Sequence, residues 1–162
     1  MISDPSVVLC GTGTSSGIPI IGCRCAVCTS EDPRDRRTRC GACLRFTDPE
    51  GRPRVVLIDC PPDHREHALR LDLDRCDTIL LTHAHVDHVF GLDDVRRYNA
   101  VQKSDIEVLA EPPVLEDLER MFRHVFRPHE NVNVSFVARL ATAPVAPGLA
   151  FDRPGGRVEP LR

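Results

Sequence analysis

The sequence has no tryptophan, one tyrosine and only 4% aromatic residues, so aliphatic side chains must supply most of its interior packing. Charge of one sign is not in excess: the net charge is -3, which argues against a protein that holds nucleic acid through a broad positive field. Long apolar runs are also missing, since none approaches the roughly 18 residues of a membrane span, and the first residues lack the basic start of a secretory signal. We therefore expect a cytoplasmic protein with no membrane partner and no nucleic acid partner.

Short apolar runs alternate with helical patterns along the 162 residues, which predicts a single α/β domain over 1–162. Two of the strands are expected to form a hairpin, because the connection TDPEGRP is rich in turn residues. A helix is expected to begin at PPDHREHALRL with Asp63 as its N-cap. The other helices are expected at 92–101 and 112–122, and the strands at 6–10, 39–46, 54–60, 77–82, 106–110 and 132–137, with a strand-like pattern at 157–162.

The densest group of metal-ligand residues is in ILLTHAHVDHVFGLDD, residues 79–94. His83 and His85 share one face of an extended segment, and Asp87 and His88 follow where the chain turns toward a helix. Imidazole with carboxylate suits zinc, iron or manganese, and two ions roughly 3.5 to 4 Å apart can clamp an oxyanion. The density of H-x-H-x-D-H argues against ordinary polar residues at a strand end, so we expect a hydrolytic metal site, with phosphoester hydrolysis as its natural use.

At these residues the chain resembles the metallo-β-lactamase superfamily, whose signature is H-x-H-x-D-H. GTGTSSGIPIIGCRCAVCTSEDPRDRRTR near the start and LIDCPPD at 57–63 make it similar to the phosphoribosyl cyclic phosphodiesterase branch, from Val7 to about Phe126. The resemblance implies an αββα sandwich that is incomplete at its C-terminus. Two divalent metal ions, zinc or manganese, are the implied cofactors.

The resemblance also implies roles for individual residues. His83 and His85 would bind the first metal ion, and Asp87 and His88 the second. Asp87 would also act in catalysis by orienting the attacking water. Asp59 matches an aspartate that supports the metal-binding loop from behind the ligands, although an ordinary turn aspartate is an equally open interpretation.

The superfamily takes its remaining ligands from the second half of its fold, and the sequence ends at Arg162 before any such residues. His124 and His129 are the only later histidines, and we expect both on the surface. His64 and His67, at a helix start, are also expected to face solvent. We therefore predict weak metal binding and little or no activity for this polypeptide alone, which sustained turnover by metal-loaded 1–162 would contradict. An uncovered apolar sheet would favour a homodimer or a missing C-terminal segment.

Cys23, Cys25 and Cys28 form a C-x-C-x-x-C motif that can wrap three thiolates around one structural zinc ion. The resemblance implies a C-terminal histidine as fourth ligand, Cys40 or Cys43 is a local alternative, and three unliganded thiols remain a further one. A redox role for Cys40-x-x-Cys43 is disfavoured because RCGACLRF is typical of a strand. The remaining cysteines are expected to be small buried residues: Cys10, Cys60 and Cys76.

Arginines follow the cysteine motif at positions 34, 36, 37 and 39, interleaved with Asp35. This run favours a solvated loop face, with steering of a phosphorylated substrate as the alternative. Arg96 or Arg97, beyond the histidines, is a candidate phosphate contact.

The favoured function is a metal-dependent phosphodiesterase that acts on a small cyclic or sugar phosphate through a metal-bound hydroxide. The alternatives are a non-catalytic fragment or degenerate metal-binding relative, a nuclease similar to ribonuclease Z, and a protein of quinone-cofactor biosynthesis.

Overall fold

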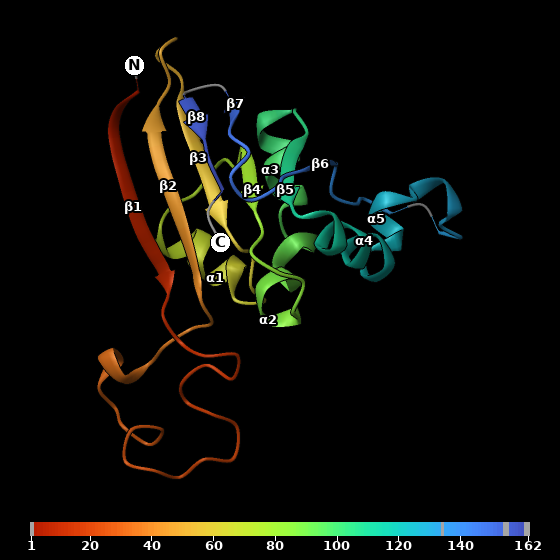
Figure 1. Ribbon diagram of the computed structural model, residues 1–162. Coiled ribbons are helices and arrows are strands. Elements are labelled where there is room, and N and C mark those ends of the chain that lie inside the picture. The colour runs from red at the N-terminus through yellow and green to blue at the C-terminus, as the bar shows by residue number, and fades with distance from the viewer. Residues whose placement is uncertain (1, 134, 154–155, 161–162) are drawn as a thin grey trace.

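The computed structural model describes residues 2–133, 135–153 and 156–160 and shows an α/β fold built on one six-stranded sheet (Figure 1). The strand order is β1-β2-β3-β4-β5-β6, with β1, β2 and β3 antiparallel and β3 to β6 parallel. The hairpin expected from TDPEGRP is therefore present. The strands are β1 (Ser3–Gly11), β2 (Gly41–Thr47), β3 (Pro53–Ile58), β4 (Thr78–Leu80), β5 (Ile106–Ala110) and β6 (Leu140–Pro144).

Helices lie behind the sheet in Figure 1, whereas a small two-stranded sheet, β7 (Phe151–Arg153) and β8 (Gly156–Val158), lies in front of it. Residues 12–40, here called the cysteine loop, extend from the end of the sheet where β1 stops and β2 starts. Among the described residues, no helix combines the length and apolarity that crossing a bilayer requires. The helices are α1 (His64–Arg70), α2 (Val86–Val89), α3 (Arg96–Gln102), α4 (Pro112–Met121) and α5 (Arg123–Phe126), with 3-10 turns at Pro33–Asp35, Phe90–Asp93 and Pro128–Glu130.

The core lies between the sheet and the helices. Cys43, Leu57, Ile79 and Val108 occupy one register row across β2 to β5, and all four are at most 1% exposed. They belong to one cluster with Leu118 of α4 and with apolar residues that follow the histidines. Each aliphatic side chain buried here contributes roughly 1.5 to 3 kcal/mol relative to an exposed one, which is how a chain without tryptophan stabilises the sheet.

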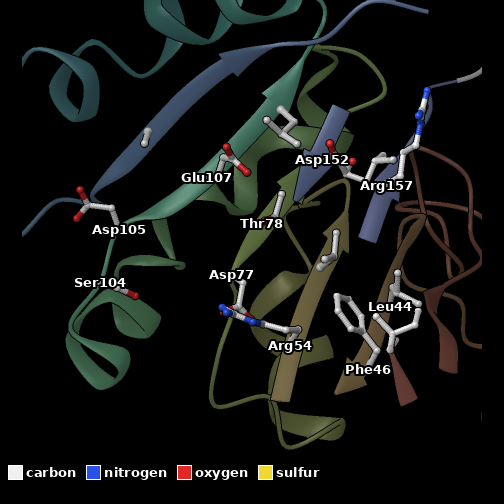
Figure 2. A pocket seen from close by; sticks show the side chains of 16 residues that line it. Leu44, Phe46, Arg54, Asp77, Thr78, Ser104, Asp105, Glu107, Asp152 and Arg157 are labelled. Atoms are coloured by element: carbon white, nitrogen blue, oxygen red, sulfur yellow. The ribbon is translucent and has the colours of Figure 1, made fainter. Parts of the chain in front are cut away.

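The opposite face of the sheet is also apolar but is only partly covered. Leu44, Val56, Leu80 and Leu109 line a cavity of about 750 Å³ between this face and the β7–β8 hairpin. Figure 2 shows that charged side chains, among them Arg54, Asp77 and Glu107, line this cavity together with apolar ones such as Leu44 and Phe46. On β1, Val7 pairs with Leu44 in the same row and is 67% exposed, so the apolar surface continues beyond the cavity.

The strand expected at 132–137 is wrong for the described part of that segment, in which Val132 is 99% and Phe136 54% exposed. The strand that pairs with β5 is β6, which begins at Leu140. Alternating β-branched residues favour a strand only where a neighbouring strand accepts them, and here the register places later residues beside β5. Val134 lies outside the described residues.

Two smaller corrections concern element boundaries. The helix expected at 92–101 is divided, because a 3-10 turn ends at Asp93 and α3 begins only at Arg96. The strand-like pattern at 157–162 corresponds to β8, which ends at Val158, and Leu161 and Arg162 lie outside the described residues.

Candidate active site

The histidine cluster is at the carboxyl ends of two adjacent parallel strands, β3 and β4. Asp59 follows β3, and Thr82 and His83 follow β4, so the side chains are brought to one edge of the sheet. Asp59 has φ of +60°, a left-handed conformation that aspartate tolerates better than most residues with a side chain. Its backbone N–H donates to the carbonyl of Leu80 at 2.9 Å, which ties the two strand ends together.

The carboxylate of Asp59 is 6% exposed and receives several hydrogen bonds. The Thr82 N–H donates to Oδ1 at 2.9 Å, and the Thr82 hydroxyl lies 3.0 and 2.9 Å from Oδ1 and Oδ2. His88 Nδ1 lies 2.7 Å from Oδ2. A buried carboxylate needs such donors because it has lost its water. Asp59 therefore orients the end of β4 and the ring of His88 at once.

The three imidazoles of the cluster are neighbours. The ring centroids of His83 and His85 are 4.6 Å apart, and those of His83 and His88 are 4.0 Å apart. Burial, together with the adjacent rings of His88 and His85, lowers the pKa of His83. A neutral imidazole is the form that can ligate a metal ion, so this environment favours the ligating form.

Asp87 and His88 form a second pair on the short helix α2. His88 Nε2 lies 3.4 Å from Asp87 Oδ2, on the side of the ring opposite to Asp59. When Nδ1–H donates to Asp59, both facing atoms carry lone pairs. A shared cation is one way to make that approach favourable.

Backbone contacts fix the segment after the histidines against the end of β3. The Cys60 N–H donates to the His88 carbonyl at 2.7 Å, and the Gly91 N–H donates to the Cys60 carbonyl at 2.9 Å. A Cβ on Gly91 would lie 2.3 Å from the Pro61 carbonyl oxygen, so only glycine permits this close approach.

The donor set and its pairwise spacing fit divalent cations. Imidazole nitrogens and one carboxylate suit zinc or manganese. The ring of His83 is adjacent to the rings of both His85 and His88, and His88 is in turn adjacent to Asp87. The ligand atoms of these four residues are farther apart than those of a second group. In the described part of the chain, that second group is the one set of three or more ligand atoms that all lie within 4.8 Å of one another. That group comprises Cys23, Cys25 and Cys28.

In the cysteine loop, Cys25 is exposed and Cys28 Sγ accepts the Ile20 N–H at 3.4 Å. Hydrogen bonding, first from the backbone of Cys28 and then from the neighbouring thiols, lowers the pKa of Cys25 to about 7. Cys40 and Cys43 are the local candidates for a fourth sulfur ligand. Cys43 is buried in the core and Cys40 is exposed, so the two thiols do not face the same place, and neither belongs to the group of three sulfur atoms described above. The remaining three cysteines are buried, as expected: Cys10, Cys60 and Cys76.

The expectation that His64 and His67 face solvent is wrong: they are 3% and 1% exposed. His64 Nε2 lies 3.1 Å from the Tyr98 hydroxyl, and His67 Nε2 lies 2.7 Å from the Thr38 hydroxyl. Positions 64, 67, 68 and 71 form the face of a helix that packs against the core. The position of the two histidines on α1 therefore determines their burial, although histidine is a polar residue. By contrast, His124 and His129 have side chains 48% and 78% exposed, on the surface as expected.

Asp63 is at the N-cap position of α1, but its side chain makes no cap hydrogen bond. It instead accepts the Arg39 backbone N–H at 2.7 Å and the Arg39 guanidinium at 2.9 Å. Arg39 Nε also donates to the Ser15 carbonyl at 2.9 Å. Asp63 and Arg39 therefore hold both ends of the cysteine loop against α1. Other arginines considered for phosphate binding have partners as well, since Arg34 pairs with Asp32 and Arg96 with Asp93.

A family model described as a β-lactamase superfamily domain matches residues 54–156, which contain the histidine cluster. The chain belongs to the metallo-β-lactamase superfamily. A protein of solved structure that is similar to this chain, a diphosphatase from the PhnP family, is 33% identical with a TM-score of 0.80, and the match covers 97% of this chain and 56% of that one. Zn²⁺-bound PqqB from Methylobacterium extorquens shares the fold at 24% identity and a TM-score of 0.69, over 100% of this chain and 56% of PqqB.

A curated relative is an octanoyltransferase from Porphyromonas gingivalis, 41% identical over 155 residues. That match covers 96% of this chain but 30% of the octanoyltransferase. The chain thus spans about half of each solved structure named above and less than a third of this curated relative.

Proposed function

We propose that this superfamily member is a metal-dependent hydrolase of small phosphorylated molecules, in the first place a phosphodiesterase acting on a small cyclic or sugar phosphate. The observation that carries the proposal is the placement of His88, whose Nδ1 lies 2.7 Å from Asp59 and whose Nε2 lies 3.4 Å from Asp87. A metal-ligating histidine usually donates its other ring N–H to a carboxylate behind it, and here a second carboxylate also lies in front of the ring.

His83 and His85 would hold one divalent ion, and Asp87 and His88 a second. Such ions, zinc or manganese, would lower the pKa of a coordinated water and neutralise charge on the phosphoryl group. This chemistry needs no serine or cysteine nucleophile.

The protein's own contribution is orientation. Asp59 fixes the ring of His88 and, through Thr82, the end of β4. Asp87 has a side chain 18% exposed, so its carboxylate can accept a hydrogen bond from the attacking water and aim it at phosphorus. Cys23, Cys25 and Cys28 would hold a separate structural zinc ion that orders the cysteine loop.

The substrate class rests on chemistry and on one relative. The diphosphatase that is 33% identical acts on a phosphorylated compound by its name. The net charge of -3 supports a small substrate over a polynucleotide. Octanoyl transfer is the activity named for a relative of which the match covers 30%, so that name gives weak support for the same activity here. The candidate site offers ligands for cations, which favours hydrolysis.

The proposal is tested by titrating purified 1–162 with Mn²⁺, which imidazole and carboxylate accept and thiolates disfavour. Binding is followed by the electron paramagnetic resonance of free Mn²⁺, and hydrolysis with bis(p-nitrophenyl) phosphate. We expect weak binding, because two protein ligands per ion is fewer than the usual three or four, and at most slow cleavage. His83→Gln and Asp87→Asn should each weaken Mn²⁺ binding by removing a ligand of one of the two ions, and each should abolish cleavage.

The matched control is His129→Gln, which removes an imidazole from an exposed position with a side chain 78% exposed. It should leave binding and cleavage as they are in the wild type. Mn²⁺ binding that is unchanged in both His83→Gln and Asp87→Asn, or that is not detected at all, would overturn the proposal.

A further inference from the structure

Thr82 lies between the buried carboxylate and the first histidine of the cluster. Its hydroxyl oxygen is 2.9 to 3.0 Å from both oxygens of Asp59 and 2.9 Å from His83 Nδ1. His88 reaches the same carboxylate directly, at 2.7 Å. One aspartate therefore contacts two rings of the cluster, one directly and the other through a hydroxyl.

Counting protons fixes the direction of these hydrogen bonds. A threonine hydroxyl has one proton to donate, and an ionised carboxylate can only accept. The Thr82 proton therefore goes to Asp59, and the Thr82 oxygen presents a lone pair to His83 Nδ1. The contact at 2.9 Å is favourable only if His83 Nδ1 carries a proton and donates it.

We propose that Thr82 is a positioning residue that holds His83 in the Nδ1–H tautomer, so that His83 Nε2 is free for a cation. Asp59 imposes the same tautomer on His88 without an intermediary. The assignment of tautomers rests on the hydrogen bonds alone, and its use in binding a cation rests on the proposed function above.

The exposure of Thr82 does not remove this effect. Water competes for an exposed hydroxyl, but Asp59 is 6% exposed and also takes the Thr82 backbone N–H, so side chain and backbone are held by the same charged acceptor. Thr82 adjoins His83 in sequence, so fixing its backbone also fixes where the ring begins.

The test is a two-bond ¹H–¹⁵N correlation spectrum of metal-free 1–162 labelled at the histidine rings and recorded at pH 8. His83→Gln and His88→Gln assign the two rings. We expect His83 and His88 in the Nδ1–H form in the wild type and in Thr82→Ser, which keeps the hydroxyl. In Thr82→Val, which keeps the shape and removes the hydroxyl, His83 should move to the Nε2–H form that free imidazole prefers, while His88 stays unchanged as an internal control.

A cation titration gives a second measurement. Mn²⁺ should bind Thr82→Val roughly 10- to 100-fold more weakly than the wild type, the usual effect of losing a group that orients a ligand, and Thr82→Ser should restore the affinity. Tautomers that follow this pattern without any Mn²⁺ binding would support the role of Thr82 and overturn the proposed function. A wild-type His83 in the Nε2–H form, or a Thr82→Val spectrum unchanged at His83, would overturn the role of Thr82 whatever the metal titration gives.

Discussion

Single residues on the inner face of α1 link the stability of the fold to pH. Burial lowers the pKa of His64 to about 4, with a smaller effect from His67, and burial likewise lowers the pKa of His67. In the unfolded chain both imidazoles bind protons near pH 6.5, whereas in the folded chain His64 stays neutral. Stability from this group is therefore complete above pH 6.5 and is lost as pH falls from 6.5 toward 4.

We predict that the free energy of unfolding of the wild type falls by roughly 1 to 2 kcal/mol between pH 7.5 and 5.5 on account of His64. His64→Gln should show a smaller fall over the same interval, because no proton is taken up at that site on unfolding. Urea denaturation followed by far-UV circular dichroism measures both. His129→Gln, at an exposed position, should keep the wild-type pH dependence, and an equal fall in wild type and His64→Gln would contradict the assignment. Ordinary carboxylates titrate below this interval.

The sequence points to the candidate ligands but not to the groups behind them. H-x-H-x-D-H is readable because its residues are adjacent, and Asp59 could be placed only through a resemblance. Thr82 was not singled out, although its position directly before His83 was a usable signal. Its contacts join residues that are 23 positions apart, and no local pattern carries that information. His64 and His67 are buried because their spacing with Ala68 and Leu71 places them on the inner face of α1, which polar residue type alone does not indicate.

At the scale of elements, the cysteine loop depends on a small set of contacts with α1. The Asp63 carboxylate accepts hydrogen bonds from the backbone N–H and the guanidinium of Arg39, and the His67 ring lies within hydrogen-bond distance of the Thr38 hydroxyl. The side chains of Arg39 and Asp63 are 31% and 21% exposed, so their pairing is shielded more than a surface pair. Apart from these contacts the loop extends away from the sheet (Figure 1).

Asp63→Ala should therefore loosen the cysteine loop. Losing hydrogen bonds to a charged group costs roughly 1 to 2 kcal/mol, which corresponds to roughly 5- to 30-fold faster cleavage within residues 12–40 by trypsin when the loop opens before it is cut. Mass spectrometry of the early fragments locates the cuts. Asp32→Ala removes an ion pair with Arg34, whose side chain is 89% exposed, and should leave the rate close to that of the wild type. Equal acceleration in both variants would show that the Asp63 contacts do not hold the loop.

The elements that the sequence predicted well are those in which local pattern and tertiary context agree. The strand at 106–110 has the predicted bounds because it is apolar and central in the sheet. The strand expected at 132–137 has a good local pattern, but its described residues do not pair with a neighbouring strand. The true edge strand, β6, is in a segment rich in alanine and proline whose composition does not favour a strand. Pairing with β5 decides its position, and the sequence of β6 alone does not carry that pairing.

At the scale of the whole molecule, the two faces of the main sheet differ in how they are covered. Helices bury one face, whereas among the described residues the other face is covered by the β7–β8 hairpin over part of its width (Figures 1 and 2). Beyond that hairpin, Val7 and Leu9 on the edge strand β1 are 67% and 68% exposed. Adjacent apolar side chains on an exposed edge strand favour association with another polypeptide.

We predict that 1–162 self-associates in a concentration-dependent manner through this face, and that Val7→Thr with Leu9→Thr shifts it toward the monomer. Threonine keeps the preference for strand structure while reducing apolar area. Sedimentation velocity over a range of concentrations measures the change. Ile21→Thr, at a position 99% exposed in the cysteine loop, is the matched control and should have no effect. A wild-type chain that stays monomeric at every concentration would contradict the prediction.

The backbone conformation of Asp59 has a consequence for how the site can change during evolution. Its φ of +60° suits glycine, asparagine and aspartate, whereas its position beside Thr82 and His88 demands a group that only accepts hydrogen bonds. Glycine removes the acceptor, asparagine introduces a competing donor, and glutamate keeps the charge but strains the main chain. Position 59 thus tolerates no other amino acid. In a deep mutational scan, every substitution at position 59 should be depleted, even where the neighbouring loop tolerates variation.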